Sequence, residues 1–534
     1  MKKLQNISLK VIFTVMLIGA FSSCSEDELN EVPKDTLAVE NLYVSTDGFL
    51  AALNDMYHVI RREYNFYYAA QLTGTDVGWT NFPHPDAQKF IDYADALNSE
   101  DVFSREFYGR AYGAIAQLNL IIQEAEKEDV EWDSPEDKTK VLAEARFFRA
   151  YQHNKMASLY GDAVIVEEYY TAPKFDFVRS SKLEVLNSVK EDLIFAAANL
   201  PCEVASLPSG RLSCWAAKHL LSEVYIGLGE YDLAASTAND IVNNSPHKLM
   251  KTRFGPEVDN PKGDVFRDLF REGNIDYNDG NLETIWVMEQ QYQEPGGTGG
   301  MWARRQIQAF SSNFLGVTVA DSTGGRGVGR ITPTQAFLDL YEPNDIRGQE
   351  SNFKRTWYYN DIDNLPPGVN YGDKVVYDET DPWLKNTVFY PSCTKWDFGV
   401  IGRGGSWTHI DADKDFPKYR LSETYLLLAE AQHLAGNNEE AKNALNEVRL
   451  RAGASAITAG DVDMDFILDE RARELYAEED RRLTLYRTGM FVDRVKAMNP
   501  QAAPGVQPKH ALFPIPQSVI DTNVDAEIAQ NPGY

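Results

Sequence analysis

The clearest indication of the fold is in residues 219–246, HLLSEVYIGLGEYDLAASTANDIVNNSP. The apolar residues of this stretch recur at helical spacing on both sides of Gly229, which predicts two helices joined by a tight turn at that glycine. Small residues such as Ala234 let the two helices approach closely. The stretch YRLSETYLLLAEAQHLAG at 419–436 repeats the arrangement, with Gly436 at its end. The sequence therefore predicts paired helices as its building unit.

Both stretches agree with the tetratricopeptide consensus. In the first, the consensus Leu, Tyr, Gly, Tyr, Ala and Pro are Leu221, Tyr225, Gly229, Tyr231, Ala234 and Pro246. The second matches through Tyr425, Leu428, Ala429, Gly436 and Ala441. A lone helix pair cannot bury its apolar face, so at least three pairs are expected to stack. The helices predicted at 101–127 and 135–160 are plausible degenerate partners.

Three earlier helices follow from spacing and capping residues. The buried face of the first is marked by Phe49, Leu53, Met56 and Ile60, and that of the second by Tyr108, Tyr112, Ile115 and Asn119. The third has Ser134 as N-cap, Asp137 at the position of a capping acid and Gly161 as its stop. The β-branched run 164–166 then leaves as an extended segment.

The helical signal lapses between roughly 246 and 415. Glycine and proline runs take its place at 295–300, 324–329 and 366–368. Thr332-Pro333 opens one short helix there, with Phe337 on its apolar face. Tryptophans indicate that this part is ordered: Trp286, Trp302, Trp357, Trp383, Trp396 and Trp407. The proline-rich segments 512–517 and 530–534 predict a rigid strap along the surface.

Residues 1–23 are predicted to be a lipoprotein signal peptide. Lysines precede the apolar stretch Val11 to Phe21, which is too short to span a bilayer, and small residues lead to Cys24, the expected lipidation site. The alternative is an ordinary secretory signal followed by a cysteine of no consequence. Residues 24–40 form an acidic tether with few large apolar groups.

Composition excludes several classes of function. The chain has 534 residues, and 52 Lys+Arg against 80 Asp+Glu give a net charge of −28, which disfavours nucleic acid and anionic lipid as partners. A neutral substrate is compatible with this charge. Cys202 and Cys214 could pair, but the sequence does not show whether they do.

Motifs for metals, nucleotides and catalysis fail on inspection. Asp411, Asp413 and Asp415 begin like a calcium loop, yet Phe416 and Ser422 stand where glycine and glutamate are required. GGRGVG lacks the context of a dinucleotide site, and P-loop, HExxH and GxSxG motifs do not occur in the sequence. Neither a cofactor nor a metal is expected.

Longer motifs resemble those of the SusD/RagB family of outer-membrane lipoproteins. They are the lipobox with its acidic follower, EARFFRAYQHNKMASLYGDAVIV at 144–166, YRLSETYLLLAEAQHLAG at 419–436, VRLRAG at 448–453, DERARELYAEEDRRLTLYRTG at 469–489, LFPIPQSVIDTN at 512–523 and QNPGY at 530–534. Thr484 stands where the family more often has Asp. The order of these motifs spans about 500 residues.

The resemblance implies a mainly α-helical protein. Residues 41–534 would form a single SusD-like domain: a tetratricopeptide-like scaffold at 41–245 and 416–534, with an irregular, loop-rich insertion at 246–415 packed on it. It further implies a lipid anchor in the outer membrane, facing the cell exterior, and a SusC-like TonB-dependent transporter as partner. It implies binding rather than catalysis.

Most charged motif residues are expected to be structural, forming ion pairs between helices: Glu144, Arg146, Arg149, Glu430, Arg471, Arg473 and Glu474. Ligand contacts are expected instead where aromatic and short polar residues meet on irregular segments, because sugar rings lie flat on aromatics and their hydroxyls need polar partners. In the resembled family two such regions contribute to the ligand site. The matching residues here are Asp76, Trp79, Asn81, Phe82, His84 and Tyr93 in the first region, and Trp302, Arg304 and Arg305 in the second.

The leading hypothesis is capture of an oligosaccharide for import through a partner barrel. One alternative is capture of peptides, which requires hydrogen-bonding groups along a groove. A second is a helical glycoside-cleaving enzyme, which predicts two inward carboxylates roughly 5–9.5 Å apart. A third is a scaffold whose only role is to close the transporter.

Overall fold

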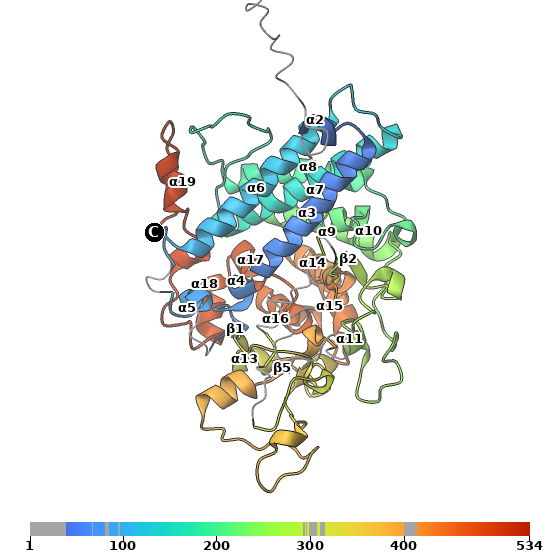
Figure 1. Ribbon diagram of the computed structural model, residues 1–534, viewed down its shortest axis with the longest axis vertical. Coiled ribbons are helices and arrows are strands. Elements are labelled where there is room, and N and C mark those ends of the chain that lie inside the picture. Colours follow the sequence, from blue (N-terminus) through green and yellow to red (C-terminus); the bar gives the residue numbers. More distant parts are fainter. Residues whose placement is uncertain are drawn as a thin grey trace, which may run out of the picture.

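The computed structural model describes residues 39–66, 68–80, 85–93, 97–291, 294, 296–297, 307–309, 315–399 and 414–534. The signal peptide, Cys24 and the tether up to residue 38 lie outside these ranges, so they stay predictions. Long helices form the upper and middle parts of the molecule, and loops with short elements lie below them (Figure 1). Within the described ranges we find no helix that is both long and apolar enough to cross a membrane.

The chain is mainly α-helical, as the sequence predicts. The α-helices are α2 (Val39–Leu42), α3 (Thr46–Phe66), α4 (Tyr68–Leu72), α5 (Pro85–Asp92), α6 (Val102–Ala125), α7 (Pro135–Tyr160), α8 (Lys182–Asn199), α9 (Cys214–Leu228), α10 (Tyr231–Asn244), α11 (Val265–Asp268), α13 (Gln335–Leu338), α14 (Leu421–Leu434), α15 (Asn438–Arg451), α16 (Met464–Leu475), α17 (Arg481–Arg487), α18 (Phe491–Met498) and α19 (Gln517–Thr522).

Consecutive helices stack into one scaffold. Helix α6 packs on α7, α7 on α8, α8 on α9 and α9 on α10. The stack continues across the irregular part of the sequence, because α10 packs on α14 and α14 on α15. The pairs α9–α10 and α14–α15 are those predicted from residue spacing, and α6 and α7 are the predicted degenerate partners. The predicted fold class is confirmed.

Alanine makes close packing possible in both predicted pairs. Ala234 and Ala238 on α10, Ala429 on α14 and Ala441 on α15 are completely buried. Gly229 follows α9 with φ at 77°, in the left-handed region that side chains with a Cβ rarely adopt. The turn between α9 and α10 therefore requires glycine, as the sequence predicts.

Helix α7 begins and ends at the predicted residues. The side chain of Ser134 accepts a hydrogen bond from the backbone N–H of Asp137, and Gly161 follows the last turn with φ at 74°. The chain then leaves as the predicted extended segment. A backbone pair between Ala163 and Ser180 holds this segment, with both N–H···O distances between 2.9 and 3.1 Å.

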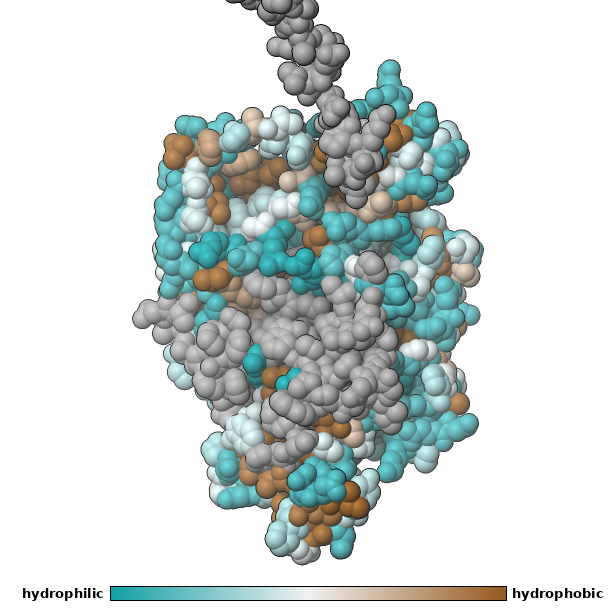
Figure 2. All heavy atoms as spheres, viewed as in Figure 1, coloured by the Kyte–Doolittle hydropathy of each residue, from teal (hydrophilic) through white to brown (hydrophobic). Residues whose placement is uncertain are grey.

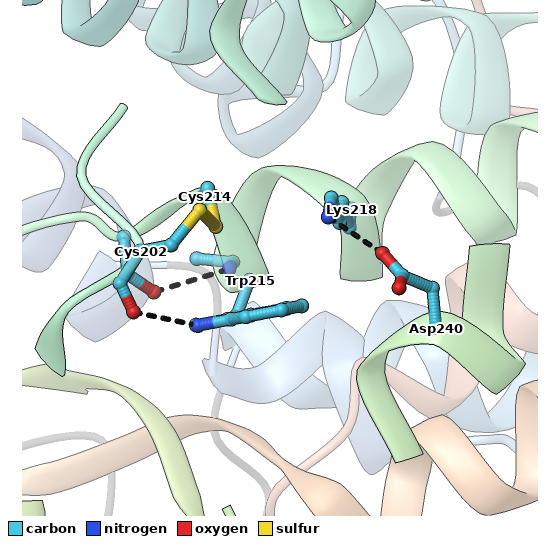
Figure 3. The surroundings of a disulfide bond; sticks show 7 residues. Cys202, Cys214, Trp215, Lys218 and Asp240 are labelled. Carbon is cyan, nitrogen blue, oxygen red and sulfur yellow. Dashed lines mark hydrogen bonds and ion pairs between the residues drawn. A yellow bond between two sulfur atoms is a disulfide. The ribbon is translucent and has the colours of Figure 1, made fainter. Parts of the chain in front are cut away.

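A disulfide joins Cys202 to Cys214 at the start of α9 (Figure 3). The two Cα atoms lie 5.0 Å apart, and the bond closes the loop between α8 and α9. The indole N–H of Trp215 donates to the carbonyl oxygen of Cys202 at 2.9 Å, and the ammonium of Lys218 lies 4.5 Å from the centre of the Trp215 ring. The pairing that the sequence left open is thus settled in this structure.

The described residues contain three short antiparallel strand pairs, each with at least one strand between residues 246 and 415. These are β1 (Gly78–Trp79) with β3 (Thr332–Pro333), β2 (Thr284–Met288) with β6 (Phe416–Arg420), and β4 (Phe353–Lys354) with β5 (Ser392–Cys393). The helix predicted to open at Thr332 begins later, because Thr332 and Pro333 pair with β1. Thr334 caps α13 instead, since its hydroxyl accepts the N–H of Phe337 at 3.2 Å.

Buried tryptophans show that the described part of the middle region is packed, whereas Trp302 and Trp407 lie outside the described residues. Trp357 belongs to a separate apolar cluster with Tyr359, Val388 and Phe389. Other parts of this region join the core of the scaffold, and their buried side chains include Trp286 and Trp396. The described part of the middle region thus shares the core of the scaffold and adds a smaller apolar cluster of its own.

Buried ion pairs connect the middle region to the C-terminal helices. We call this cluster the arginine junction; its members are Glu283, Arg347, Arg420, Arg451, Glu470, Glu474 and Glu478. Arg347 contacts Glu470 at 2.7 Å and Glu474 at 3.0 Å. Arg420 contacts Glu474 at 3.1 Å, and Arg451 also pairs with Glu474. One carboxylate on α16 thus receives three guanidinium groups from three parts of the chain.

The other charged residues predicted to be structural also pair between elements. Arg149 on α7 binds Asp192 on α8 through two hydrogen bonds of 2.7 and 2.8 Å. Arg471 contacts Glu423 at 2.8 Å, which joins α16 to α14. Arg146 also contacts α8, because its guanidinium lies 4.2 Å from the centre of the Phe195 ring.

The predicted strap, residues 512–534, lies against the helices at one side of the scaffold. The N–H of Phe513 donates to the carbonyl oxygen of Leu159 at 2.7 Å. The amide of Asn531 donates to the carbonyl oxygens of Tyr160 at 2.9 Å and Phe513 at 2.7 Å. The strap thus covers the C-terminal end of α7.

Candidate ligand cleft

A polar cleft runs along one face of α3. Two adjoining hollows of about 600 and 370 Å³ share Asn54, Arg61 and Glu289 in their walls. Together they extend from the 289–297 segment to the loop around Arg211. We call this feature the α3 cleft.

The amphipathic pattern of α3 positions one wall. Phe49, Leu53, Met56 and Ile60 are buried against the scaffold, as their spacing predicts. Asn54, His58 and Arg61 recur at i, i+4 and i+7 on another face of the same helix, so their side chains line the cleft together. Asp55 adds a carboxylate beside them.

The opposite wall is fastened to α3 by hydrogen bonds. Arg61 donates to the carbonyl oxygens of Glu289 and Gly296, the latter at 2.5 Å. A ring nitrogen of His58 lies 2.8 Å from the same Gly296 oxygen. These contacts hold the segment that follows β2 at a fixed distance from the helix.

A buried cluster supports the far end of the cleft. Arg211 contacts Glu144 at 2.8 Å and donates to the side-chain oxygen of Asn54 at 2.6 Å. The hydroxyl of Tyr57 donates to Glu144 at 3.0 Å. Burial raises the pKa of the Glu144 carboxyl, although Arg211 opposes that effect. Trp286 lies beneath, and its indole N–H donates to the carbonyl oxygen of Gly210 at 3.1 Å.

The cleft offers hydrogen-bonding groups rather than a flat apolar plate. Trp286 is 2% exposed, so its ring face is covered. The exposed lining residues carry amides and carboxylates: Asn54, Asp55, Glu289, Gln291 and Glu294. Such groups pair with ligand hydroxyls, which both donate and accept. Within the described ranges no group of three or more His, Cys, Asp or Glu residues is arranged to hold a metal ion.

Two predicted site residues lie inside the protein. Asp76 is completely buried and contacts Arg481 at 2.6 Å and Arg494 at 2.8 Å. Burial alone would raise the pKa of Asp76, but these two arginines outweigh it and lower the pKa. The hydroxyl of Tyr93, also completely buried, donates to the carbonyl oxygen of Gly74 at 2.7 Å and accepts from Arg482 at 2.9 Å. This geometry favours a structural role for both.

Of the remaining predicted site residues, only Trp79 lies within the described ranges. Trp79 is partly exposed in β1, where its backbone pairs with Thr332. Asn81, Phe82, His84, Trp302, Arg304 and Arg305 lie outside the described residues. Glu294, Gly296 and Gly297, which belong to the second predicted region, line the α3 cleft. The structure therefore brings part of that region to the cleft.

Sequence reasoning missed the polar face of α3. The signal was present, because Asn54, His58 and Arg61 have the same helical periodicity as the apolar face that was identified. Polar residues on a helix are most often solvated, however, and nothing local distinguishes a cleft wall from an exposed face. The partner wall at Glu289 is more than two hundred residues away in sequence.

Comparisons with known proteins agree with the fold. The profile described as "SusD family" matches residues 282–534, and that described as "Starch-binding associating with outer membrane" matches residues 36–226. The SusD-like protein P25 of Formosa agariphila is 22% identical over 98% of this chain and 97% of its own length. The starch-binding protein SusD of Bacteroides thetaiotaomicron is 36% identical over 129 residues, which are 23% of this chain and 22% of that protein.

Solved structures share the architecture over most of the chain. A SusD homolog from Bacteroides thetaiotaomicron has a TM-score of 0.72 at 20% identity, covering 93% of this chain and 98% of that one. A laminarin-binding SusD-like protein has a TM-score of 0.69 at 20% identity, covering 92% of this chain and all of that one. At these identities the likeness establishes the fold alone.

Proposed function

The chain belongs to the SusD/RagB family, and on that premise we propose that it captures a neutral oligosaccharide in the α3 cleft for delivery to a SusC-like TonB-dependent transporter. The names of its relatives support glycan as the ligand class, since one is a starch-binding protein and another binds laminarin. The description of the matching profile as outer-membrane-associated supports the place of action.

The observation that carries the proposal is the lining of the α3 cleft. Its exposed amides and carboxylates suit a ligand rich in hydroxyl groups. Asp55, Glu289 and Glu294 are negatively charged, while Arg61 and Arg211 already donate to protein oxygens. An anionic glycan would meet repulsion there, so a neutral one fits better.

The role we infer is binding rather than catalysis. The names of the family and its relatives describe binding proteins and support this inference. Incubation of the protein with a retained glycan should leave the chain length of that glycan unchanged. Release of shorter sugars, abolished by Glu289→Gln, would contradict the inference.

The first experiment screens the soluble chain from residue 25 onward by affinity gels and calorimetry. The panel contains neutral plant, fungal and host polysaccharides, sulfated and uronic acid polymers, and a peptide mixture. We expect retention by a neutral glycan. Binding to peptides alone would replace the ligand class, and a preference for anionic polymers would contradict the assigned charge selection.

Variants then test the cleft itself. Asn54→Ala removes a hydrogen-bonding side chain, and Glu289→Gln replaces one acceptor oxygen by an amide donor. We expect affinity to fall about two- to ten-fold for each, as for loss of a typical hydrogen bond. Glu440→Gln, an exposed change on α15, is the matched control and should bind normally. Unchanged affinity in both cleft variants would place the site elsewhere.

Trp79 and Trp302 remain proposed stacking residues. Trp79→Ala and Trp302→Ala should each weaken glycan binding, because an aromatic plate covers the apolar face of a sugar ring. If calorimetry gives the parent affinity for both variants, ligand recognition does not depend on stacking by these two rings.

The anchor and the transporter need separate experiments. Cys24→Ala should move the protein from the membrane fraction to the soluble fraction and abolish labelling by a radioactive fatty acid. Affinity purification of the unmutated protein from detergent-solubilised membranes should recover a TonB-dependent barrel. Unchanged fractionation of Cys24→Ala would contradict the anchor, and recovery without any barrel would contradict the partnership.

A further inference from the structure

A second hollow lies on another side of the scaffold, remote in sequence from the walls of the α3 cleft. It has a volume of about 330 Å³ and lies between α6, the extended segment that follows α7, and the strap. Figure 2 shows a recess with hydrophobic residues at its bottom at the upper left, beside the position of α19 in Figure 1. We call it the aromatic pocket.

Rings from two elements form the walls. Tyr108 and Tyr112 stand one turn apart on α6, and their ring centres are 4.7 Å apart. Tyr170, Phe175 and Phe177 come from the extended segment, and the rings of Tyr170 and Phe177 meet edge to face at 5.9 Å. Tyr170 and Phe175 keep about two fifths of their surface exposed. Large apolar surface of this kind is unusual unless something covers it.

Two polar side chains in the walls, Tyr112 and Asn523, already bond to the protein. The hydroxyl of Tyr112 donates to the carbonyl oxygen of Val164 and accepts its N–H, both at 3.0 Å. The side chain of Asn523 accepts the N–H of Phe177 at 2.8 Å and donates to its carbonyl oxygen at 2.9 Å. A buried sugar hydroxyl would lose its water without gaining a partner here. The interior therefore suits an apolar group and not a glycan.

A lysine ammonium lies close to two of these rings. The ammonium of Lys174 lies 5.6 Å from the centre of the Tyr170 ring and 5.5 Å from that of Phe177. It pairs with Asp176 at 2.6 Å, and both side chains are substantially exposed, at 32% and 54%. An exposed pair of this kind contributes little and can exchange one carboxylate for another.

We propose that the aromatic pocket binds a small aromatic carboxylate. The ring lies between the tyrosine and phenylalanine walls, and the carboxylate takes the place of Asp176 on Lys174. An engineered apolar cavity of about 150 Å³ holds one benzene molecule. The aromatic pocket has roughly twice that volume, so it accommodates a ring with a short side chain that reaches the ammonium.

The pocket is independent of the proposed glycan function, because none of its lining residues lines the α3 cleft. Variants of the pocket should retain glycan like the parent protein. Failure of one proposal therefore leaves the other standing.

Calorimetry with two matched probes tests the assignment. Cinnamate carries the carboxylate, and cinnamyl alcohol has the same ring and chain length without charge. We expect the acid to bind about two- to five-fold more tightly than the alcohol, as for an exposed ion pair. Lys174→Gln should abolish this preference and leave the alcohol unaffected. Asp176→Asn should increase it, because the ammonium then has no competing carboxylate.

A filled pocket provides the control for location. Ala116 is half-buried in the wall on α6, so Ala116→Phe should occupy the space and eliminate binding of both probes. Val519→Trp fills it from the strap and serves if the first variant unfolds, which circular dichroism checks. Equal affinity for acid and alcohol in the parent protein, binding that survives both filling variants, or no binding of either probe would overturn the proposal.

Discussion

The helix pairs and the arginine junction are both buried, yet different forces hold them. In the pairs, alanine and leucine side chains such as Leu427 and Ala441 pack without polar atoms. In the junction, Arg347 and Glu474 are equally hidden from water but are charged. Apolar packing is non-directional and depends on area and fit, whereas buried ion pairs depend on geometry and on both partners being present.

The difference corresponds to what each region must join. Helices of the scaffold repeat one shape, so apolar stripes suffice to stack them. The middle region has no repeating surface to present. Directed ion pairs from Arg347 to the carboxylates of α16 and from Glu283 to Arg451 fix its position on the helices. Specific charged contacts thus take over where regular secondary structure ends.

The strongest way to break the junction is Glu474→Gln. This change keeps the shape but leaves three buried guanidinium groups without their shared carboxylate. We expect the free energy of unfolding to fall by about 3–5 kcal/mol, measured by urea denaturation. Glu447→Gln is the control, since the exposed pair of Glu447 with Lys251 should contribute about 0–1 kcal/mol. If Glu474→Gln lowers the free energy of unfolding by less than Glu447→Gln does, the junction does not stabilise the fold.

The matching change in the scaffold is Leu427→Ala. Removal of a completely buried leucine side chain should cost about 2–5 kcal/mol, through lost transfer energy and a residual cavity. The same urea experiment measures it.

The stability costs of Glu474→Gln and Leu427→Ala should depend differently on pH. In the junction, arginines overcome the effect of burial and hold the pKa of Glu474 well below its usual range. The Glu474 carboxylate therefore stabilises the fold above the unfolded-state pKa of about 4.3, and the benefit is lost progressively as pH falls below that value. The cost of Leu427→Ala should stay constant over that interval, while the cost of Glu474→Gln should shrink. If the stability costs of both variants change equally with pH, the two regions are not held by different forces.

Removal of the disulfide should weaken the scaffold at the start of α9, where Cys214 is completely buried. The double change Cys202→Ser with Cys214→Ser opens a loop between residues 12 positions apart. The chain-entropy estimate for a loop of this size is about 3 kcal/mol, and we expect a loss of that order. Reduction of the parent protein under the same denaturant should give a similar shift, and no shift on reduction would mean that the bond does not constrain the unfolded chain.

The smallest expected effect is a gain in stability rather than a loss. Burial raises the pKa of Asp415 to about 7, with nearby carboxylates adding to the shift. Protonation thus favours the folded state between about pH 4 and pH 7, and stability falls as pH rises through that range. Asp415→Asn keeps an acceptor for the N–H of Gln290 and should gain on the order of 1 kcal/mol at pH 8. The gain should vanish at pH 4; a loss at pH 8 would contradict the assignment.

Local signals predicted the scaffold, and distant partners limited the prediction of the site. Gly229 and the alanines of the pairs have meaning within a few residues, so spacing was sufficient. The sequence predicts Asp76 as a ligand contact because it lies near Trp79 in an irregular stretch. Its partner Arg481, however, lies 405 residues away in sequence. The walls of the α3 cleft likewise meet only in the folded chain. Residue periodicity predicts helices. Which polar residues are accessible depends on contacts between residues far apart in sequence, which periodicity does not show.

The strap also has a consequence for biosynthesis. Asn531 binds the carbonyl oxygen of Tyr160, which lies 371 residues earlier in the chain. At about 5–20 residues per second, the ribosome needs roughly 20–70 s to make the intervening chain. During that time the end of α7 lacks its cover and the aromatic pocket lacks one wall. Newly made chains therefore need protection from premature association, and a nonsense mutation just before the strap would leave a nearly full-length protein with an open edge.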